Sequence, residues 1–239
     1  MNKKYLLAIC IFMFGFICFF QGNIYSSPQK TITLENGGKA IIYLPERYNP
    51  KKRYPLIMVL HGMRQTAEYT IQVWKHAANE LNMILVCPHG SDFNNAYTGA
   101  PIDDRKNFIG FLNYIDHNYK VDFSKSLLVG FSRGGSFAIE TGILYPRKFR
   151  NIVCIFGFFN KKLLPIIDKN NKRRTYRKSH FYFITGKGDL TLISAKDGYL
   201  ALKARKIKSK LKIFNHLNHN YPPDLITEVK RIQKWIFGR

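Results

Sequence analysis

Short apolar runs alternate with amphipathic stretches from about residue 31 to the end of the chain. The apolar runs have the length of strands, and the stretches between them carry apolar residues at helical spacing. The expected strands are 31–34, 40–44, 56–60, 83–87, 126–129, 152–156, 180–185 and 211–214. The expected helices are 66–81, one around 108–115, 132–145, 194–206 and one around 225–236. Near-continuous apolar strands are buried on both faces, so the pattern predicts an α/β fold with a doubly wound, mostly parallel sheet.

The N-terminus has a different pattern from the rest. Lys3 and Lys4 precede an unbroken apolar run of 16 residues, Tyr5 to Phe20. A basic start followed by an apolar core is typical of a signal peptide, and the run is short of the roughly 20 residues that span a membrane comfortably. We therefore expect residues 1–26 to be a signal peptide or an uncleaved membrane anchor. Residues 27–239 are then one extracytoplasmic domain.

Two cysteines remain outside that segment. Cys87 and Cys154 both lie in strand-like apolar runs, which favours small buried core residues, with a single disulfide as the alternative in an oxidising compartment. No spacing of cysteine and histidine suggests a zinc site.

A glycine-flanked serine joins a predicted strand to a predicted helix. Gly130, Ser132 and Gly134 form a Gly-x-Ser-x-Gly motif directly after the strand 126–129. A sharp strand-to-helix turn of this kind strains the serine backbone, exposes its hydroxyl and leaves no room for side chains two residues away. The N-terminus of the following helix favours negative charge beside the serine. Ser132 is therefore the predicted nucleophile.

A nucleophilic serine needs an acid and a histidine, which follow it in this order on a sheet of this type. Asp189 comes just after the strand 180–185, at the sheet edge where such sites form, although a turn residue or helix cap is the alternative role. Asp168 and Asp197 are placed less well, in a basic connection and inside a helix. His219 stands before the last helix, and we favour it over His216 as the base.

A tetrahedral intermediate needs hydrogen-bond donors aimed at its oxyanion. The backbone N–H of Arg133, directly after the nucleophile, is one candidate. The second is the backbone N–H of Met63, in the loop after the strand 56–60. His61, in the same loop, is expected to hold the loop shape and to take no part in catalysis.

Taken together, these motifs resemble the α/β-hydrolase superfamily, and most closely the compact secreted esterases grouped with polyhydroxybutyrate depolymerases, feruloyl esterases and dienelactone-hydrolase-like enzymes. The resemblance covers residues 31–239. The matching segments are 55–63, 127–135, Tyr145-Pro146 with Phe149, 186–189 and 219–222.

The resemblance implies an α/β-hydrolase fold, no cofactor or metal, and cleavage of carboxylic esters through an acyl-enzyme. In that mechanism Ser132 attacks, His219 carries the proton and Asp189 orients the imidazole. The polar, basic stretch 160–179 is linker-like and stands in the place of a minimal cap. Because a triad does not fix the bond that is cleaved, a peptidase, thioesterase or lipase remains an alternative. A catalytically silent binder of anionic envelope components is another.

Basic residues greatly outnumber acidic ones. Lys and Arg total 38 against 15 Asp and Glu, a formal net charge of +23, with local concentrations in 160–179 and 202–212. No nucleic-acid-binding motif or group of stacking aromatics accompanies the lysines, so we expect no nucleic-acid partner. The expected partner is a small-molecule or polymer-linked ester. The basic surface is expected to be solvated, with attraction to a membrane or anionic envelope surface as the alternative.

Overall fold

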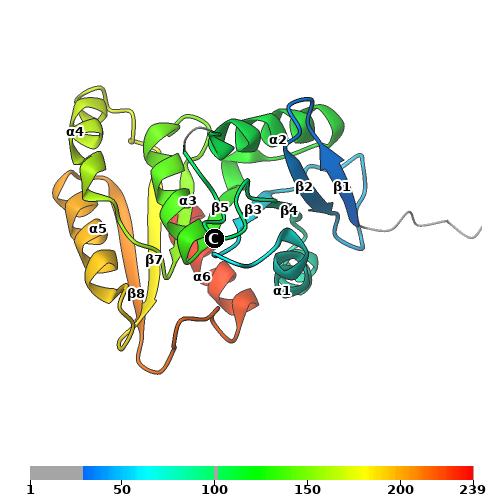
Figure 1. Ribbon diagram of the computed structural model, residues 1–239. Coiled ribbons are helices and arrows are strands. Elements are labelled where there is room, and N and C mark those ends of the chain that lie inside the picture. Colours follow the sequence, from blue (N-terminus) through cyan, green and yellow to red (C-terminus); the bar gives the residue numbers. More distant parts are fainter. Residues whose placement is uncertain (1–28, 100–101, 239) are drawn as a thin grey trace, which may run out of the picture.

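The computed structural model describes residues 29–99 and 102–238. They form one eight-stranded sheet covered by helices on both faces (Figure 1). The signal or anchor segment expected over residues 1–26 lies outside the described residues. Among the residues that are described, no helix is long and apolar enough to span a membrane.

The sheet has the strand order β1-β2-β4-β3-β5-β6-β7-β8. The pairs β1–β2 and β2–β4 are antiparallel and all other neighbours are parallel. In Figure 1 the β1–β2 hairpin lies at the right edge and β7 and β8 at the left. The strands are β1 (Gln29–Thr33), β2 (Lys39–Tyr43), β3 (Leu56–Leu60), β4 (Ile84–Pro88), β5 (Leu127–Phe131), β6 (Asn151–Ile155), β7 (His180–Gly186) and β8 (Lys208–Phe214).

Helices cover the two faces of the sheet unequally. The α-helices are α1 (Ala67–Glu80), α2 (Asp104–Asn118), α3 (Arg133–Leu144), α4 (Leu164–Lys172), α5 (Leu192–Ala204) and α6 (Leu225–Phe237), with 3-10 turns η1 (Phe123–Lys125) and η2 (Lys161–Leu163). Helices α2, α3, α4 and α5 pack into one apolar core and α1 and α6 into the other. Along β3, Met58 faces the first core while Ile57 and Val59 face the second. This alternation explains why the strands are apolar throughout.

The predicted doubly wound, mostly parallel α/β sheet is confirmed, and two segments differ from expectation. The linker-like stretch 160–179 contains η2 and α4, because Leu163 and Ile167 turn one apolar face of this basic segment into the core. Strand β8 begins at Lys208, three residues before the expected start. Among the described residues β8 pairs with β7 alone. An edge strand tolerates polar residues, and the polar residues at the start of β8 made this start hard to predict.

Cys87 on β4 and Cys154 on β6 are both buried free thiols. They belong to opposite cores, so the sheet itself separates them. The expectation of buried core cysteines is therefore confirmed, and the alternative of a disulfide between them is wrong for this structure.

Candidate active site

Ser132 occupies a strained turn between β5 and α3. Its backbone has φ 54° and ψ −119°, a conformation that a non-glycine residue adopts only when its surroundings enforce it. The Ser132 N–H donates to the Ile155 carbonyl at 2.8 Å, which fixes the turn to the neighbouring strand. A Cβ at Gly130 would collide with the Gly134 carbonyl, and a Cβ at Gly134 would collide with the His61 carbonyl. Both glycines of the motif are therefore sterically required.

The structure brings Ser132, Asp189 and His219 together at the carboxyl edge of the sheet. Asp189 follows β7, and His219 lies on the loop between β8 and α6. His219 Nε2 is 2.9 Å from Ser132 Oγ, and His219 Nδ1 is 3.0 Å from Asp189 Oδ2. One imidazole thus links the hydroxyl to the carboxylate, an arrangement in which it can accept the serine proton.

Among the described residues, none of the less favoured candidates hydrogen-bonds to this group. Asp168 forms an ion pair with Arg205, and Asp197 forms one with Lys161. His216 is exposed on the same loop as His219.

A buried threonine pair holds Asp189. Asp189 Oδ1 accepts hydrogen bonds from the Thr191 N–H at 2.7 Å and the Thr191 hydroxyl at 2.6 Å. The Thr191 hydroxyl also contacts that of Thr185 at 3.0 Å. Burial raises the pKa of Asp189, but the bonds from Thr191 and His219 outweigh it and leave this pKa below its usual value. The carboxylate is therefore ionised at neutral pH. Sequence reasoning missed Thr191, although an Asp-x-Thr spacing after a strand is a known turn signal.

Two aromatic rings pack around His219. The ring centroids of Phe131 and Phe156 lie 5.3 and 5.1 Å from that of the imidazole. The His219 side chain is 39% exposed, whereas the Asp189 side chain is only 6% exposed. The Asp189 carboxylate is thus shielded from water, while the His219 imidazole is partly open to it.

The loop that carries Met63 lies against Ser132. A Cβ on Gly62 would sit 3.3 Å from the Cβ of Ser132. The Gly62 N–H donates to Gln65 Oε1 at 2.9 Å, and the Gln65 N–H returns to the Gly62 carbonyl at 3.2 Å. None of the hydrogen bonds found among the described residues uses the N–H of Met63. Arg133 is the first residue of α3, where an N–H has no partner within the helix. Both N–H groups are therefore available to an oxyanion.

His61 ties this loop to the next one. Its Nε2 accepts from the Gly90 N–H at 3.3 Å, so Nδ1 carries the proton and donates to the Gly62 carbonyl at 2.9 Å. Burial lowers the pKa of His61, which keeps the ring neutral. The ring contacts loop backbone, in agreement with the expected structural role.

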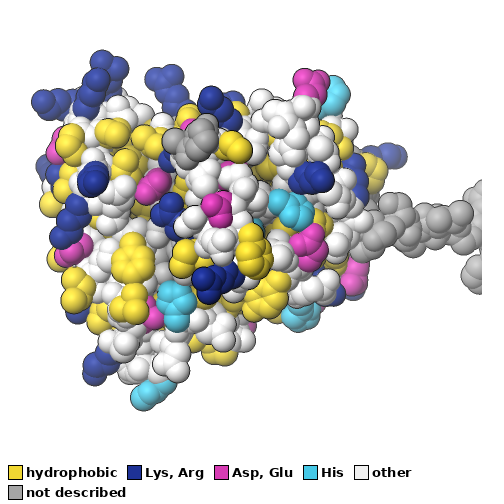
Figure 2. Space-filling model, in the orientation of Figure 1, with side chains coloured by type: hydrophobic (Ala, Val, Ile, Leu, Met, Phe, Trp, Pro, Cys, Tyr) yellow, Lys and Arg dark blue, Asp and Glu magenta, His cyan; other side chains and the backbone are white. Residues whose placement is uncertain are grey.

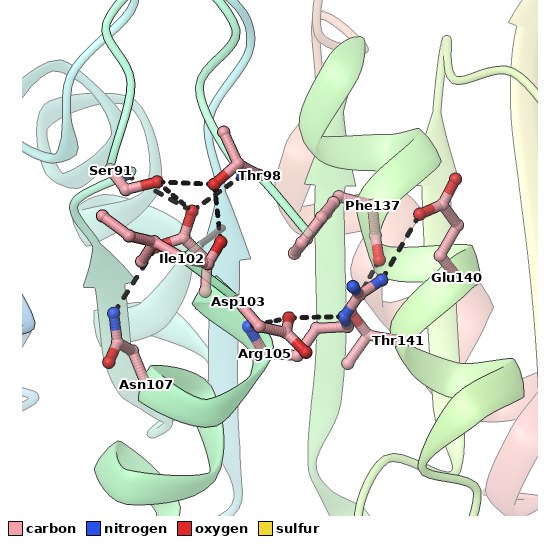
Figure 3. Close-up of polar contacts among 10 residues, drawn as sticks. Ser91, Thr98, Ile102, Asp103, Arg105, Asn107, Phe137, Glu140 and Thr141 are labelled. Carbon is pink, nitrogen blue, oxygen red and sulfur yellow. Dashed lines mark hydrogen bonds and ion pairs between the residues drawn. The ribbon is translucent and has the colours of Figure 1, made fainter. Parts of the chain in front are cut away.

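A cavity of about 240 Å³ opens beside Ser132. It is lined by Met63, Ser132, Arg133, Ser136, Glu140, Phe158, Phe159 and Asn160. Ser136 and Glu140 are four residues apart and share one face of α3, whose N-terminus follows Ser132 directly. One lining residue, Glu140, belongs to the polar contacts shown in Figure 3. Arg105 contacts Asp103 at 2.7 Å and Glu140 at 3.5 Å, and its guanidinium lies over the Phe137 ring. One buried cation is thus shared by two carboxylates. The contact with Glu140 joins α2 to α3 and could not be read from the sequence.

Within the described ranges, 29–99 and 102–238, no group of three or more His, Cys, Asp or Glu side chains is arranged to hold a metal ion.

Comparisons with known proteins agree with the fold. The model of the Esterase family, described as "Putative esterase", matches residues 32–184, more than half of the chain. No curated protein matches the sequence. Among solved structures, the fluorophosphonate-binding serine hydrolase F (FphF) of Staphylococcus aureus is similar, with TM-score 0.72, 15% identity, and 87% of this chain and 96% of that chain covered. A ferulic acid esterase has TM-score 0.63 and 18% identity, with 80% of this chain and 90% of that chain covered.

A third similar structure is the S-formylglutathione hydrolase (FrmB) of Staphylococcus aureus. It has TM-score 0.69 and 15% identity, with 87% of this chain and 94% of that chain covered. At these identities the similarity establishes a common fold, and the resemblance to α/β hydrolases expected from the motifs is confirmed.

Proposed function

The chain belongs to the Esterase family and is a hydrolase of the α/β-hydrolase fold, and we propose that it is a serine carboxylesterase with Ser132, His219 and Asp189 as its catalytic triad. The observation that carries the proposal is the bridging imidazole, 2.9 Å from the hydroxyl and 3.0 Å from the carboxylate. These separations are within the reach that proton transfer requires.

The proposed reaction has two halves. In the first, Ser132 Oγ attacks the ester carbonyl and passes its proton to His219 Nε2. The backbone N–H groups of Met63 and Arg133 stabilise the resulting oxyanion. The C–O bond to the alcohol then breaks, and the alcohol leaves with the proton from Nε2. In the second half, water loses a proton to Nε2 and attacks the acyl-enzyme, which releases the acid and restores the Ser132 hydroxyl.

Asp189 acts through His219 in this scheme. Its carboxylate accepts from Nδ1–H, which leaves Nε2 free to receive a proton and stabilises the imidazolium once it forms. The bonds from Thr191 hold the carboxylate in the orientation that this role needs.

The cavity suggests a small acyl group. A volume of about 240 Å³ lies below the range usual for drug-sized ligands, and Met63, Phe158 and Phe159 supply apolar wall. Similar structures include a ferulic acid esterase and an S-formylglutathione hydrolase, so thioesters are the second substrate class to test.

The test is a kinetic panel of p-nitrophenyl esters of increasing acyl length, with matched thioesters and anilides. We expect the short esters to be cleaved fastest and Ser132→Ala to reduce kcat by about 10⁴-fold or more. Ser124→Ala, at an exposed serine, is the control and should keep full activity. Faster turnover of thioesters or anilides would replace the carboxylesterase assignment, and an active Ser132→Ala would overturn the triad.

We also propose that residues 1–26 direct the enzyme out of the cytoplasm. The support is the sequence alone: Lys3 and Lys4 followed by 16 apolar residues. Cell fractionation with N-terminal sequencing tests this. A soluble extracytoplasmic form beginning near residue 27 indicates cleavage, a membrane-bound full-length form indicates an anchor, and recovery of the full-length protein in the cytoplasm contradicts the proposal.

A further inference from the structure

A groove of about 770 Å³ lies at the edge of the sheet opposite the triad. One wall is the turn from α3 to β6, residues 144–150, and the other is the segment from α4 to β7, residues 170–178. Both segments precede their strands, whereas the triad follows the carboxyl ends of β5, β7 and β8. Since β7 has seven residues, about 20 Å separates the groove from the triad.

The groove is lined by several basic side chains, and no acidic side chain of the described residues lines it. Its seven cationic residues, all exposed, are Arg147, Lys148, Arg150, Arg173, Arg174, Arg177 and Lys178. The two lining segments contain no Asp or Glu. None of the seven forms an ion pair with another residue of the part of the chain that the structure describes. In Figure 2, dark blue side chains stand at the upper left, over the end of the molecule that Figure 1 labels α4.

Helix ends account for only part of this charge. Helices α3 and α4 both end at the groove, and each helix C-terminus carries the equivalent of about −0.5 charge. Two such ends offset about one positive charge out of seven. About six positive charges therefore remain, repelling one another across a concave surface. This repulsion is a cost to the folded protein that an anionic ligand would relieve.

The two walls are fixed to each other before any ligand arrives. The Tyr176 hydroxyl donates to the Ile143 carbonyl at 2.8 Å and accepts from Asn170 Nδ2 at 3.3 Å. The His180 N–H donates to the Arg150 carbonyl at 2.7 Å. A ligand would therefore meet a preformed groove and need not order it first.

We propose that this groove binds a linear polymer of phosphate groups. Five of the seven cations are arginines, whose planar guanidinium groups match phosphate oxygens in pairs. A single phosphate would engage few of them, whereas a chain of phosphates can engage cations on both walls.

The shape and the aromatic content of the groove favour such a polymer over other anionic partners. A concave surface fits a flexible chain better than the flat face of a bilayer. Bases of a single-stranded nucleic acid would need exposed stacking rings, and the two tyrosines here are half-buried Tyr145 and buried Tyr176. The proposed ligand is therefore a phosphate chain without bases.

The test measures fluorescence anisotropy of end-labelled inorganic polyphosphate titrated with the full chain. The groove variant replaces Arg147, Arg150, Arg173 and Arg177 by Gln. Its matched control replaces Lys39, Lys75, Lys106 and Lys196 by Gln, four exposed lysines on β2, α1, α2 and α5 without ion pairs among the described residues. Both variants lose four positive charges, so any difference between them reports position and not net charge.

We expect the groove variant to bind polyphosphate about tenfold more weakly or worse. The slope of log binding constant against log salt concentration should become smaller by about 3. Each phosphate that the four arginines no longer neutralise accounts for roughly 0.7 of this change. The control should keep affinity within about threefold and nearly the same slope. Thermal unfolding checks that both variants are folded, and turnover of a soluble ester should be unchanged in both. Equal weakening in the two variants, or tighter binding of oligo-dT or of phosphatidylglycerol vesicles than of polyphosphate, would overturn the proposal.

Discussion

Replacing Asp189 by Asn tests how this carboxylate acts, because its two oxygens accept hydrogen bonds from different partners and an amide has an oxygen on one side only. Oδ1 accepts two hydrogen bonds from Thr191, while Oδ2 accepts one from His219 Nδ1. An amide has only one oxygen. If that oxygen keeps the two Thr191 bonds, the NH₂ group faces His219 Nδ1 and donates to it. The imidazole must then carry its proton on Nε2, pointing at Ser132 Oγ, and cannot accept the serine proton.

The magnitude follows from the same bonds. Turning the amide so that its oxygen faces His219 gives up two hydrogen bonds worth about 1 kcal/mol each. A difference of about 2 kcal/mol leaves only about 3% of molecules in the productive orientation. Loss of the negative charge beside the imidazolium removes further stabilisation of the transition state. We therefore expect kcat to fall by about 10³ to 10⁴-fold with little change in KM.

A double variant separates this explanation from simple loss of charge. Asp189→Asn combined with Thr191→Val removes one of the two bonds that hold the amide in the wrong orientation. We expect the double variant to be about fivefold more active than Asp189→Asn alone, whereas Thr191→Val alone should reduce activity. Steady-state kinetics on a p-nitrophenyl ester measures all four proteins, with thermal unfolding as the check on folding. If Asp189→Asn kept activity within tenfold of the unmodified protein, the proposed role of this carboxylate would be wrong.

Further predictions concern stability. Gly134→Ala should abolish activity and lower the free energy of unfolding by about 3 kcal/mol, because the new Cβ would collide with the carbonyl oxygens of Leu60 and His61. Urea unfolding measures the loss of stability, and an unchanged midpoint would contradict the prediction. Arg105→Met should lower the free energy of unfolding by about 3 kcal/mol, since Asp103 and Glu140 would lose their shared cation. Thermal unfolding measures this loss, and an unchanged melting temperature would contradict it. Burial, together with Lys208, lowers the pKa of His180 to about 4, below the 6.5 expected in the unfolded chain. The contribution of His180 to the free energy of unfolding is therefore fully present above pH 6.5. It is lost as the pH falls toward 4, and the loss is about 2 kcal/mol when solvent screening is included. In His180→Gln this part of the pH dependence should vanish, and an unchanged pH profile of unfolding would contradict the assignment.

The order of elements and the three proposed catalytic side chains could be predicted because each follows a local signal. Ser132 sits in a motif whose glycines are sterically required, and Asp189 and His219 each come directly after an apolar strand. The parallel sheet then places all three at one edge, and no further long-range information is needed.

Contacts between distant segments could not be predicted in this way. Nothing in the local sequence pairs Arg105 with Glu140 or sets Phe156 against His219, because these contacts depend on how helices and loops pack. Helix α4 was hidden for a related reason: its basic surface outweighs the two apolar positions that bind it to the core. The basic groove likewise forms only when the segments before β6 and β7 come together, although the charge of each is visible in the sequence.

The most direct test of the triad is to find which atom reacts. The purified protein is inactivated with diisopropyl fluorophosphate, digested, and its peptides are mapped by mass spectrometry, with loss of esterase activity followed in parallel. We expect one phosphoryl adduct per chain, on Ser132. It should form at the rate at which activity is lost, and much more slowly in His219→Ala. Complete inactivation with Ser132 unmodified, or an adduct that forms equally fast without His219, would contradict it.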